Sequence, residues 1–349
     1  MLPTEVLEKA QSELTNWQGS GMSVMEVSHR GKPFVACAAS AEQRLRNLLN
    51  IPDNYHVLFL QGGATGQFSA IPMNLTSPGD TVTYLNTGQW SAKAIKAAKA
   101  QDLNVEVLAD EKQSNYSTVP AAGSYTIPAQ ARYLHYTPNE TIGGVTFDYV
   151  PDTGGIPLIA DCSSMILSRP MDISQYALIY AGAQKNLGPA GLTVVIVRED
   201  LTGKARPTTP DILDYAAMAA ADSMLNTPPT FGIYLLDLVL AWVEKMGGVE
   251  AMEQRNRAKA EALYSFIDNH EFYANPVAIN ARSQMNVPFT LANPDLDKTF
   301  LAEAEQAGLT NLAGHRSVGG MRASIYNAMG QDGVDALIGF MTTFADNHA

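Results

Sequence analysis

The sequence is poor in cysteine, in basic residues and in long apolar runs. Only Cys37 and Cys162 are present among 349 residues, so a disulfide framework and a cysteine-based metal site are both excluded. No apolar run approaches the ~20 residues that span a bilayer, and no charged-then-apolar leader opens the chain. We therefore expect a cytoplasmic protein with no membrane segment and no metal.

Positive charge is also scarce. The chain has 23 Lys and Arg against 35 Asp and Glu, a net charge of −12. Nucleic acid is excluded as a partner because no basic field is available to displace its counterions. If the ligand is an anion, the positive charge that binds it must come from a few residues at the site. The apolar fraction of 46% is enough for a sizeable core.

What is present is an alternation of strand and helix patterns. Short apolar runs predict strands, and glycine turns lead into amphipathic helices. Such alternation indicates an α/β fold with a mostly parallel sheet covered on both faces, that is, three layers. The predicted strands are residues 56–60, 80–86, 103–109, 131–136, 156–161, 176–182 and 192–198, and the clearest predicted helices are residues 62–75 and 88–100.

The pattern changes around Gly247 and Gly248 to a long predicted helix over 250–269, followed by strand-helix units. We therefore expect a large domain over 1–248 and a smaller C-terminal α/β domain over 249–349. Whether the first few residues pack with the small domain is left open by the pattern.

Three features stand at the ends of predicted strands, where open α/β sheets bind ligands. Gly62 and Gly63 lead into a helix near Ala64 and Thr65. The backbone N–H groups there could bind phosphate, although a simple tight turn explains the glycines equally well. Asp161 ends a buried strand, where an unpaired carboxylate would be costly. It could cap a helix, form a salt bridge or pair with a protonated ring nitrogen.

Lys185 follows the next predicted strand in a glycine-rich setting. Burial would lower its pKa and make the neutral amine a nucleophile suited to Schiff-base formation, whereas a lysine that reaches the surface is the alternative. A phosphate cradle, a strand-end Asp and a strand-end Lys are the contacts that pyridoxal phosphate requires. Trp90 could stack on its flat ring or simply pack in the core.

Longer motifs carry a resemblance. The stretches "YAGAQKNLGPAG" (180–191), "YLHYTPNETIGG" (133–144), "MLNTPPTFGIYLL" (224–236) and "GGMRASIYNAM" (319–329) are similar to those of the phosphoserine aminotransferase family, class V aminotransferases of the fold-type I pyridoxal-phosphate enzymes. The resemblance runs nearly end to end. The sequence departs from the family pattern at two places. It has Thr65 where some members carry a basic residue, and family members carry a further segment before the position that corresponds to Met1.

The resemblance implies one pyridoxal phosphate per subunit, bound as a Schiff base to Lys185 with Asp161 against the ring nitrogen. It also implies a homodimer with shared sites, because the family binds the cofactor phosphate partly from the second subunit. The remaining cofactor contacts that it implies are Trp90 on the ring, Thr141 at the phenolic oxygen, and Ala64, Thr65, Gln184, Asn226 and Thr227 at the phosphate.

The implied substrates are glutamate and 3-phosphohydroxypyruvate, interconverted with 2-oxoglutarate and O-phospho-L-serine in serine biosynthesis. Some members also act on 4-phosphohydroxy-L-threonine in pyridoxine biosynthesis. The resemblance places Arg322 at the α-carboxylate. It places a distal-anion pocket at His29, Arg30, His315 and Arg316.

The sequence admits two alternatives. The class V relatives that remove sulfur from cysteine need a cysteine on a mobile loop, whereas Cys37 lies in a predicted helix and Cys162 adjoins the buried Asp161. A non-catalytic homologue that binds a phosphorylated metabolite is the second alternative. It would leave Lys185 and Asp161 without a role.

Overall fold

The computed structural model describes residues 1–316 and 318–348. Within them, a seven-stranded sheet has the order β1-β9-β8-β7-β4-β2-β3. All seven strands predicted from the sequence are confirmed, with shifts of a few residues at their ends. Their bounds are Tyr55–Leu60 (β1), Thr81–Asn86 (β2), Asn104–Asp110 (β3), Leu134–Tyr136 (β4), Leu158–Asp161 (β7), Leu178–Gly182 (β8) and Thr193–Arg198 (β9).

The sheet is mostly parallel, as predicted. β2 pairs in parallel with β3 and β4, β4 with β7, and β7 with β8. β9 is antiparallel to both β8 and β1, so β1 runs in the same direction as β8. The carboxyl ends of all strands except β9 therefore meet at one edge of the sheet, and the loops that follow them come together there.

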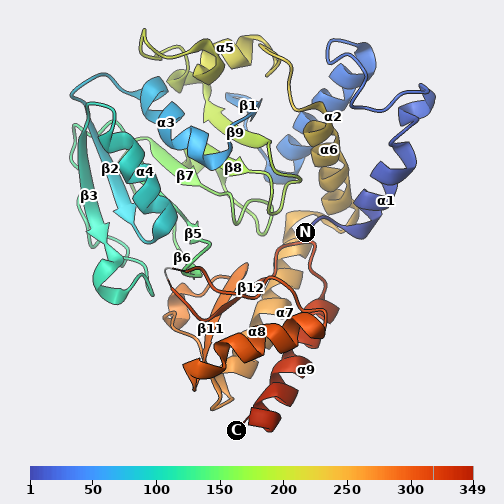
Figure 1. The fold of residues 1–349 in the computed structure, drawn as a ribbon. Coiled ribbons are helices and arrows are strands. Elements are labelled where there is room, and N and C mark those ends of the chain that lie inside the picture. Colours follow the sequence, from blue (N-terminus) through green and yellow to red (C-terminus); the bar gives the residue numbers. More distant parts are fainter. Residues whose placement is uncertain (317, 349) are drawn as a thin grey trace.

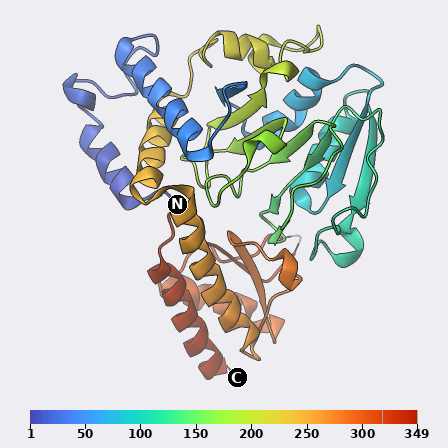
Figure 2. The same cartoon turned by 180° about the vertical axis from the view of Figure 1, so that it is seen from behind.

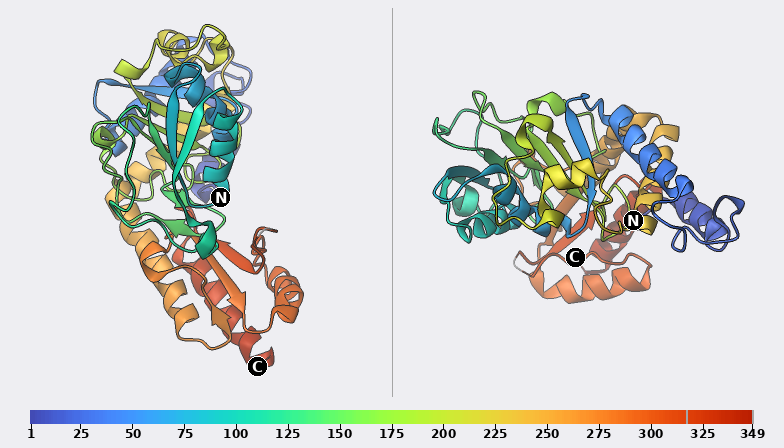
Figure 3. Two further views of the ribbon diagram at one scale, coloured as in Figure 1. Left: turned by 90° about the vertical axis from the view of Figure 1, so that its left-hand side faces the viewer. Right: turned by 90° about the horizontal axis from the view of Figure 1, so that it is seen from above.

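Helices cover both faces of this sheet (Figures 1 and 3). On one face lie α2 (Lys32–Leu49) and α6 (Thr230–Lys245), with α1 (Thr4–Glu13) packed on α6. On the other lie α3 (Gly63–Leu75), α4 (Gln89–Lys99) and α5 (Tyr215–Ala220). Neighbouring residues of β8 show the alternation, since Ile179 belongs to the first core and Tyr180 to the second. The predicted three layers are confirmed.

A smaller antiparallel sheet follows in the chain, with strands β10 (Tyr273–Ala274), β11 (Asn286–Leu291) and β12 (Met321–Ser324). It packs with α7 (Gly248–Asp268), α8 (Asp297–Gln306) and α9 (Gln331–His348) around a core of its own. Helix α7 connects the two parts (Figure 2). Its Val249 belongs to the core under α2 and α6, whereas its Leu263 belongs to the core of the smaller sheet.

Short elements complete the described chain. A small hairpin follows β4, in which two strands of two residues each, β5 (Asn139–Glu140) and β6 (Val145–Thr146), pair in antiparallel fashion. The 3-10 helices are Trp17–Gly19, Glu111–Ser114, Ile173–Gln175, Glu199–Leu201, Asp211–Leu213, Ile279–Ala281 and Pro294–Leu296. No helix formed by residues 1–316 and 318–348 is long and apolar enough to cross a bilayer.

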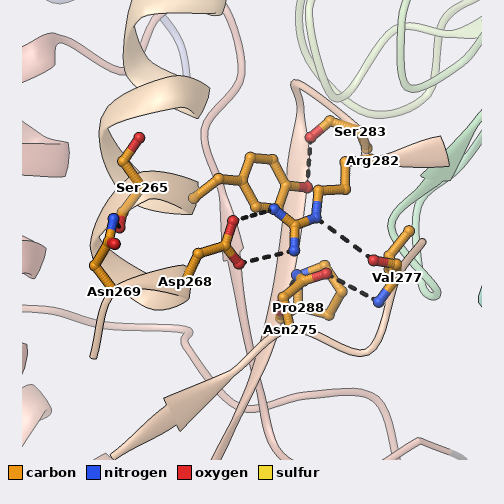
Figure 4. A network of polar contacts seen from close by, with 9 residues as sticks. Ser265, Asp268, Asn269, Asn275, Val277, Arg282, Ser283 and Pro288 are labelled. Atoms are coloured by element: carbon orange, nitrogen blue, oxygen red, sulfur yellow. Dashed lines mark hydrogen bonds and ion pairs between the residues drawn. The ribbon is translucent and has the colours of Figure 1, made fainter. Parts of the chain in front are cut away.

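Arg282 joins the end of α7 to the segment that enters β11 (Figure 4). Its guanidinium donates to both carboxylate oxygens of Asp268, at 2.6 and 2.8 Å. The same group lies 4.7 Å from the ring centroid of Tyr264, whose hydroxyl donates to the Ser283 carbonyl at 2.8 Å. The hydrogen bonds from Arg282 lower the pKa of Asp268. This network fixes the smaller sheet on the helix that connects it to the large one.

Candidate active site

The strand-end loops enclose one cavity at the carboxyl edge of the large sheet. Five segments supply its walls, at the ends of β1, β2, β4, β7 and β8, in keeping with the common direction of these strands. Of the predicted cofactor contacts, all except Asn226 and Thr227 line it. The lining residues are Gly63, Ala64, Thr65, Trp90, Thr137, Asn139, Thr141, Asp161, Ser163, Ser164, Gln184 and Lys185.

Lys185 follows β8 and is half-buried. Its Nζ donates a hydrogen bond to Oγ1 of Thr141 at 2.7 Å. Burial lowers the pKa of Lys185 to about 8, and the charge of Arg322 acts in the same direction, whereas the carboxylates of Asp161 and Glu140 oppose the shift. A sizeable fraction of the amine is therefore neutral near physiological pH, as a nucleophile requires.

Asp161 is the last residue of β7 and is only 4% exposed. Its Oδ1 accepts hydrogen bonds from the backbone N of Ser163 at 3.0 Å and from the Ser163 hydroxyl at 2.6 Å. Burial raises the pKa of Asp161, while the Ser163 bonds and the nearby Lys185 oppose the rise. Ser163 Oγ also accepts from the backbone N of Gly182 at 3.0 Å, which ties the end of β7 to the end of β8.

The turn between β1 and α3 is shaped by two glycines. Gly62 and Gly63 have φ angles of +94° and +63°, which side chains rarely adopt. Helix α3 begins without a side-chain cap and without an acidic residue in its first turn. Its first N–H groups, including those of Ala64 and Thr65, have no partner within the helix, and both residues line the cavity. This is a favourable place for a phosphate group.

Trp90 lies in the first turn of α4. Its ring is half-buried, and the Nζ atoms of Lys93 and Lys185 lie 4.1 and 5.7 Å from its centroid. Its backbone N donates to Oε2 of Glu140 at 3.1 Å. The sequence-based prediction included Trp90 and missed Glu140.

The predicted substrate residues are not among those that line this cavity. Arg322, on β12, is half-buried, and its charge acts on the pKa of Lys185. His29 is half-buried and Arg30 exposed just before α2, and His315 and Arg316 are exposed. None of these four lines the cavity around Lys185. Asn226 and Thr227 are also exposed, and the Thr227 carbonyl accepts from Nε2 of Gln61 at 3.2 Å.

Sequence reasoning also missed Thr137, Asn139, Ser163 and Ser164. One signal could have identified them, because polar residues follow β4 and β7 directly, at strand ends already expected to bind a ligand. Three polar atoms around the site are buried without a partner among the described residues: Trp90 Nε1, Thr137 Oγ1 and Arg322 Nε. Together with the helix start and the Lys185 amine, they fit a flat, anionic, carbonyl-bearing cofactor such as pyridoxal phosphate.

A family model described as aminotransferase class-V matches residues 1–337. The phosphoserine aminotransferase of Pseudomonas putida is 57% identical over 347 residues, covering 99% of this chain and 96% of the relative. That of Azotobacter vinelandii is 58% identical with the same coverage. Among solved structures, the phosphoserine aminotransferase of Bacillus circulans subsp. alkalophilus has a TM-score of 0.98 at 48% identity, covering 100% of this chain and 97% of that one.

A phosphoserine aminotransferase from Trichomonas vaginalis, solved with pyridoxal phosphate bound, has a TM-score of 0.93 at 41% identity. It covers 98% of this chain and 97% of its own. These relatives match both parts of the fold.

Proposed function

The chain belongs to the class V aminotransferases and, within them, to the phosphoserine aminotransferase family, and on that premise we propose that it transfers the amino group between L-glutamate and 3-phosphohydroxypyruvate. The products are 2-oxoglutarate and O-phospho-L-serine, in serine biosynthesis. One observation carries the proposal. The buried Asp161 ends β7, and Lys185, with its lowered pKa, follows the adjacent parallel strand β8; both line one cavity with the start of α3.

The cofactor is pyridoxal phosphate, one per subunit. When bound, it supplies an aldehyde that combines with amines and a conjugated ring that accepts electrons. Lys185 would bond to the aldehyde, Asp161 would pair with the ring nitrogen, Trp90 would lie against the ring and Thr141 would donate to the phenolic oxygen. The phosphate would be held by Ala64, Thr65 and Gln184, and by Asn226 and Thr227 of a second subunit.

Each of these residues has a physical task. The neutral Lys185 amine removes the proton from Cα of the amino-acid substrate, since its pKa of about 8 lies close to working pH. The Asp161 carboxylate keeps a proton on the ring nitrogen, because separating the two would leave a buried charge unpaired. The first N–H groups of α3 hold an anion without a side-chain charge.

Substrate anions call for arginine. We place Arg322 at the α-carboxylate, which is supported by its influence on the pKa of Lys185. We place His29, Arg30, His315 and Arg316 around the distal anion, a carboxylate in one substrate and a phosphate in the other. The planar guanidinium binds either group in a bidentate manner.

A homodimer with shared sites is part of the proposal. Its support is that Asn226 and Thr227 are exposed and absent from the lining of their own chain's cavity. We further propose a large domain over 1–248 and a small one over 249–349, and a cytoplasmic location, which the buried free thiols of Cys37 and Cys162 favour. Activity on 4-phosphohydroxy-L-threonine stays a prediction.

The proposal is tested by incubating the purified protein with pyridoxal phosphate, O-phospho-L-serine and 2-oxoglutarate and measuring glutamate. We expect turnover by the unaltered protein and none by Lys185→Ala, whose thermal unfolding should stay close to that of the unaltered protein. Substantial turnover by Lys185→Ala would overturn the role of Lys185. No turnover by the unaltered protein would favour the alternative, a non-catalytic protein that binds a phosphorylated metabolite.

A further inference from the structure

Glu140 is a fully buried carboxylate beside the cavity. It is the second residue of β5, at 0% exposure, and no ion pair of its carboxylate occurs among residues 1–316 and 318–348. A buried carboxylate without a cation is costly unless hydrogen bonds satisfy both oxygens. Its contacts must therefore explain why it is there.

Both of its oxygens face the first turn of α4. Oε1 accepts from the backbone N and the hydroxyl of Ser91, each at 2.8 Å, and Oε2 accepts from the backbone N of Trp90 at 3.1 Å. These two N–H groups belong to the first helical turn, which has no partners inside the helix. The negative charge also lies at the positive end of the α4 dipole.

The sequence leaves room for this arrangement. Helices usually receive such a cap from Ser, Thr, Asp or Asn at the residue before the first turn, whereas here that residue is Gly88. A Cβ added at Gly88 would lie 2.6 Å from Cδ of Glu140. The carboxylate thus occupies the place of the usual capping side chain and reaches it from 50 residues further along the chain.

We propose that Glu140 is a positioning residue for Trp90, holding the start of α4 so that the indole stays against the cofactor ring. This proposal rests on the proposed function only in requiring the cofactor. The indole Nε1 of Trp90 has no hydrogen-bond partner among the described residues, so the backbone bond to Glu140 fixes the position of Trp90, and the ammonium of Lys93 lies over the ring at 4.1 Å. The hydroxyl of the adjoining Thr141 accepts a hydrogen bond from the Lys185 amine, so one short segment orients both the indole and the lysine.

The proposal predicts that Glu140 acts through Trp90. Four proteins test this by a double-mutant cycle: the unaltered chain, Glu140→Gln, Trp90→Ala and the double variant. The readouts are the Kd of pyridoxal phosphate for the cofactor-free protein and the visible circular dichroism of the bound cofactor. We expect Glu140→Gln to raise the Kd about tenfold, the value of one lost hydrogen bond to a charged group, and to weaken the dichroism.

In the Trp90→Ala background the same change should have little further effect. Full additivity would mean that Glu140 acts by another route, such as its charge on Lys185, and would overturn the proposal. So would an unchanged Kd in Glu140→Gln while Trp90→Ala raises it. A protein that binds no pyridoxal phosphate would overturn this proposal together with the proposed function, which separates that failure from the other two.

A matched control distinguishes positioning from simple loss of a helix cap. Asp214 caps α5 by accepting from the backbone N of Ala216 at 2.8 Å, on a helix that does not line the cavity. Asp214→Ala, which removes the cap, should lower the unfolding temperature without changing the Kd of the cofactor. If Glu140→Gln lowers stability and leaves both cofactor readouts unchanged, as Asp214→Ala does, Glu140 is structural only. Should Glu140→Gln not fold, Ser91→Ala removes one of the same contacts and must shift the Kd in the same direction.

Discussion

Nζ of Lys185 donates a hydrogen bond to Oγ1 of Thr141 at 2.7 Å. The amine is thus held by a neutral hydroxyl, with the charges of Asp161 and Glu140 acting from further away. A neutral partner orients the nitrogen without strongly favouring its charged form, which is consistent with a pKa lowered to about 8. Orientation and nucleophilicity are therefore compatible in this site.

Thr141→Val should show how much the hydrogen bond between Thr141 and Lys185 contributes to catalysis. Valine keeps the shape of threonine and removes the hydroxyl, so the amine loses its orienting partner. We expect kcat to fall about tenfold, as for one lost hydrogen bond of 1–2 kcal/mol, with little change in unfolding temperature. Thr141→Ser, which keeps the hydroxyl, should retain most of the activity. Equal losses in the two variants would contradict this explanation.

The covalent capture of pyridoxal phosphate by Lys185 should depend on pH. The reaction needs the neutral amine, so the rate should rise about tenfold per pH unit below pH 8 and level off above it. Stopped-flow absorbance of the cofactor-free protein measures this rate. In Asp161→Asn the midpoint should move to lower pH, because the Asp161 charge favours the ammonium form. A midpoint near 10, the ordinary value for lysine, would contradict the burial argument.

Asp161→Asn should also lower turnover by orders of magnitude, because an amide cannot keep a charged ring nitrogen protonated. Steady-state kcat at saturating cofactor and substrates measures the loss. Unchanged turnover would make Asp161 a structural residue.

Arg30→Ala should weaken the binding of both substrates together. If one pocket receives the glutamate carboxylate and the phosphate of 3-phosphohydroxypyruvate, the KM of each should rise about tenfold to a hundredfold, the value of a lost charged hydrogen bond. Arg132→Ala is the matched control, since Arg132 is an exposed arginine paired with Asp80 at 2.8 Å. A rise confined to one substrate would contradict a shared pocket.

Arg282→Lys should destabilise the protein without affecting catalysis. Lysine cannot reproduce the two bonds to Asp268 or the contact with the Tyr264 ring, and we expect a loss of about 1 kcal/mol in the free energy of unfolding. The lowered pKa of Asp268 means that the pair stabilises the fold above pH ~4 and that this is lost as pH falls through the folded pKa. Denaturant unfolding at a series of pH values should therefore show a difference between the two proteins that is largest near pH 7 and shrinks as pH falls through the folded pKa of Asp268.

The strands and the strand-end residues could be predicted from the sequence because their signals are local. Buried parallel strands appear as short apolar runs, and the common direction of those strands brings Asp161 and Lys185 to one edge. Thr141 and Gln184 came with the family resemblance, and the structure places them in the same cavity as Trp90.

Glu140 could not be found in this way, since its contacts join segments that lie far apart in the sequence. Glu140 caps a helix that lies 50 residues earlier in the chain, and the spacing of apolar residues in the sequence gives no sign of this contact. The pattern also left open which small residues follow β7 toward the cavity. The loop carrying Asn226 and Thr227 is a third case, because its proposed partner is a second copy of the chain.

The most direct test of the account is the visible absorption of the purified protein with pyridoxal phosphate, recorded before and after addition of glutamate and then of 3-phosphohydroxypyruvate. We predict a yellow band that disappears with glutamate and returns with 3-phosphohydroxypyruvate, while Lys185→Ala gives no such cycle. A band that ignores glutamate would contradict the assigned donor. No band at all would contradict the assignment of Lys185 as the cofactor-binding lysine.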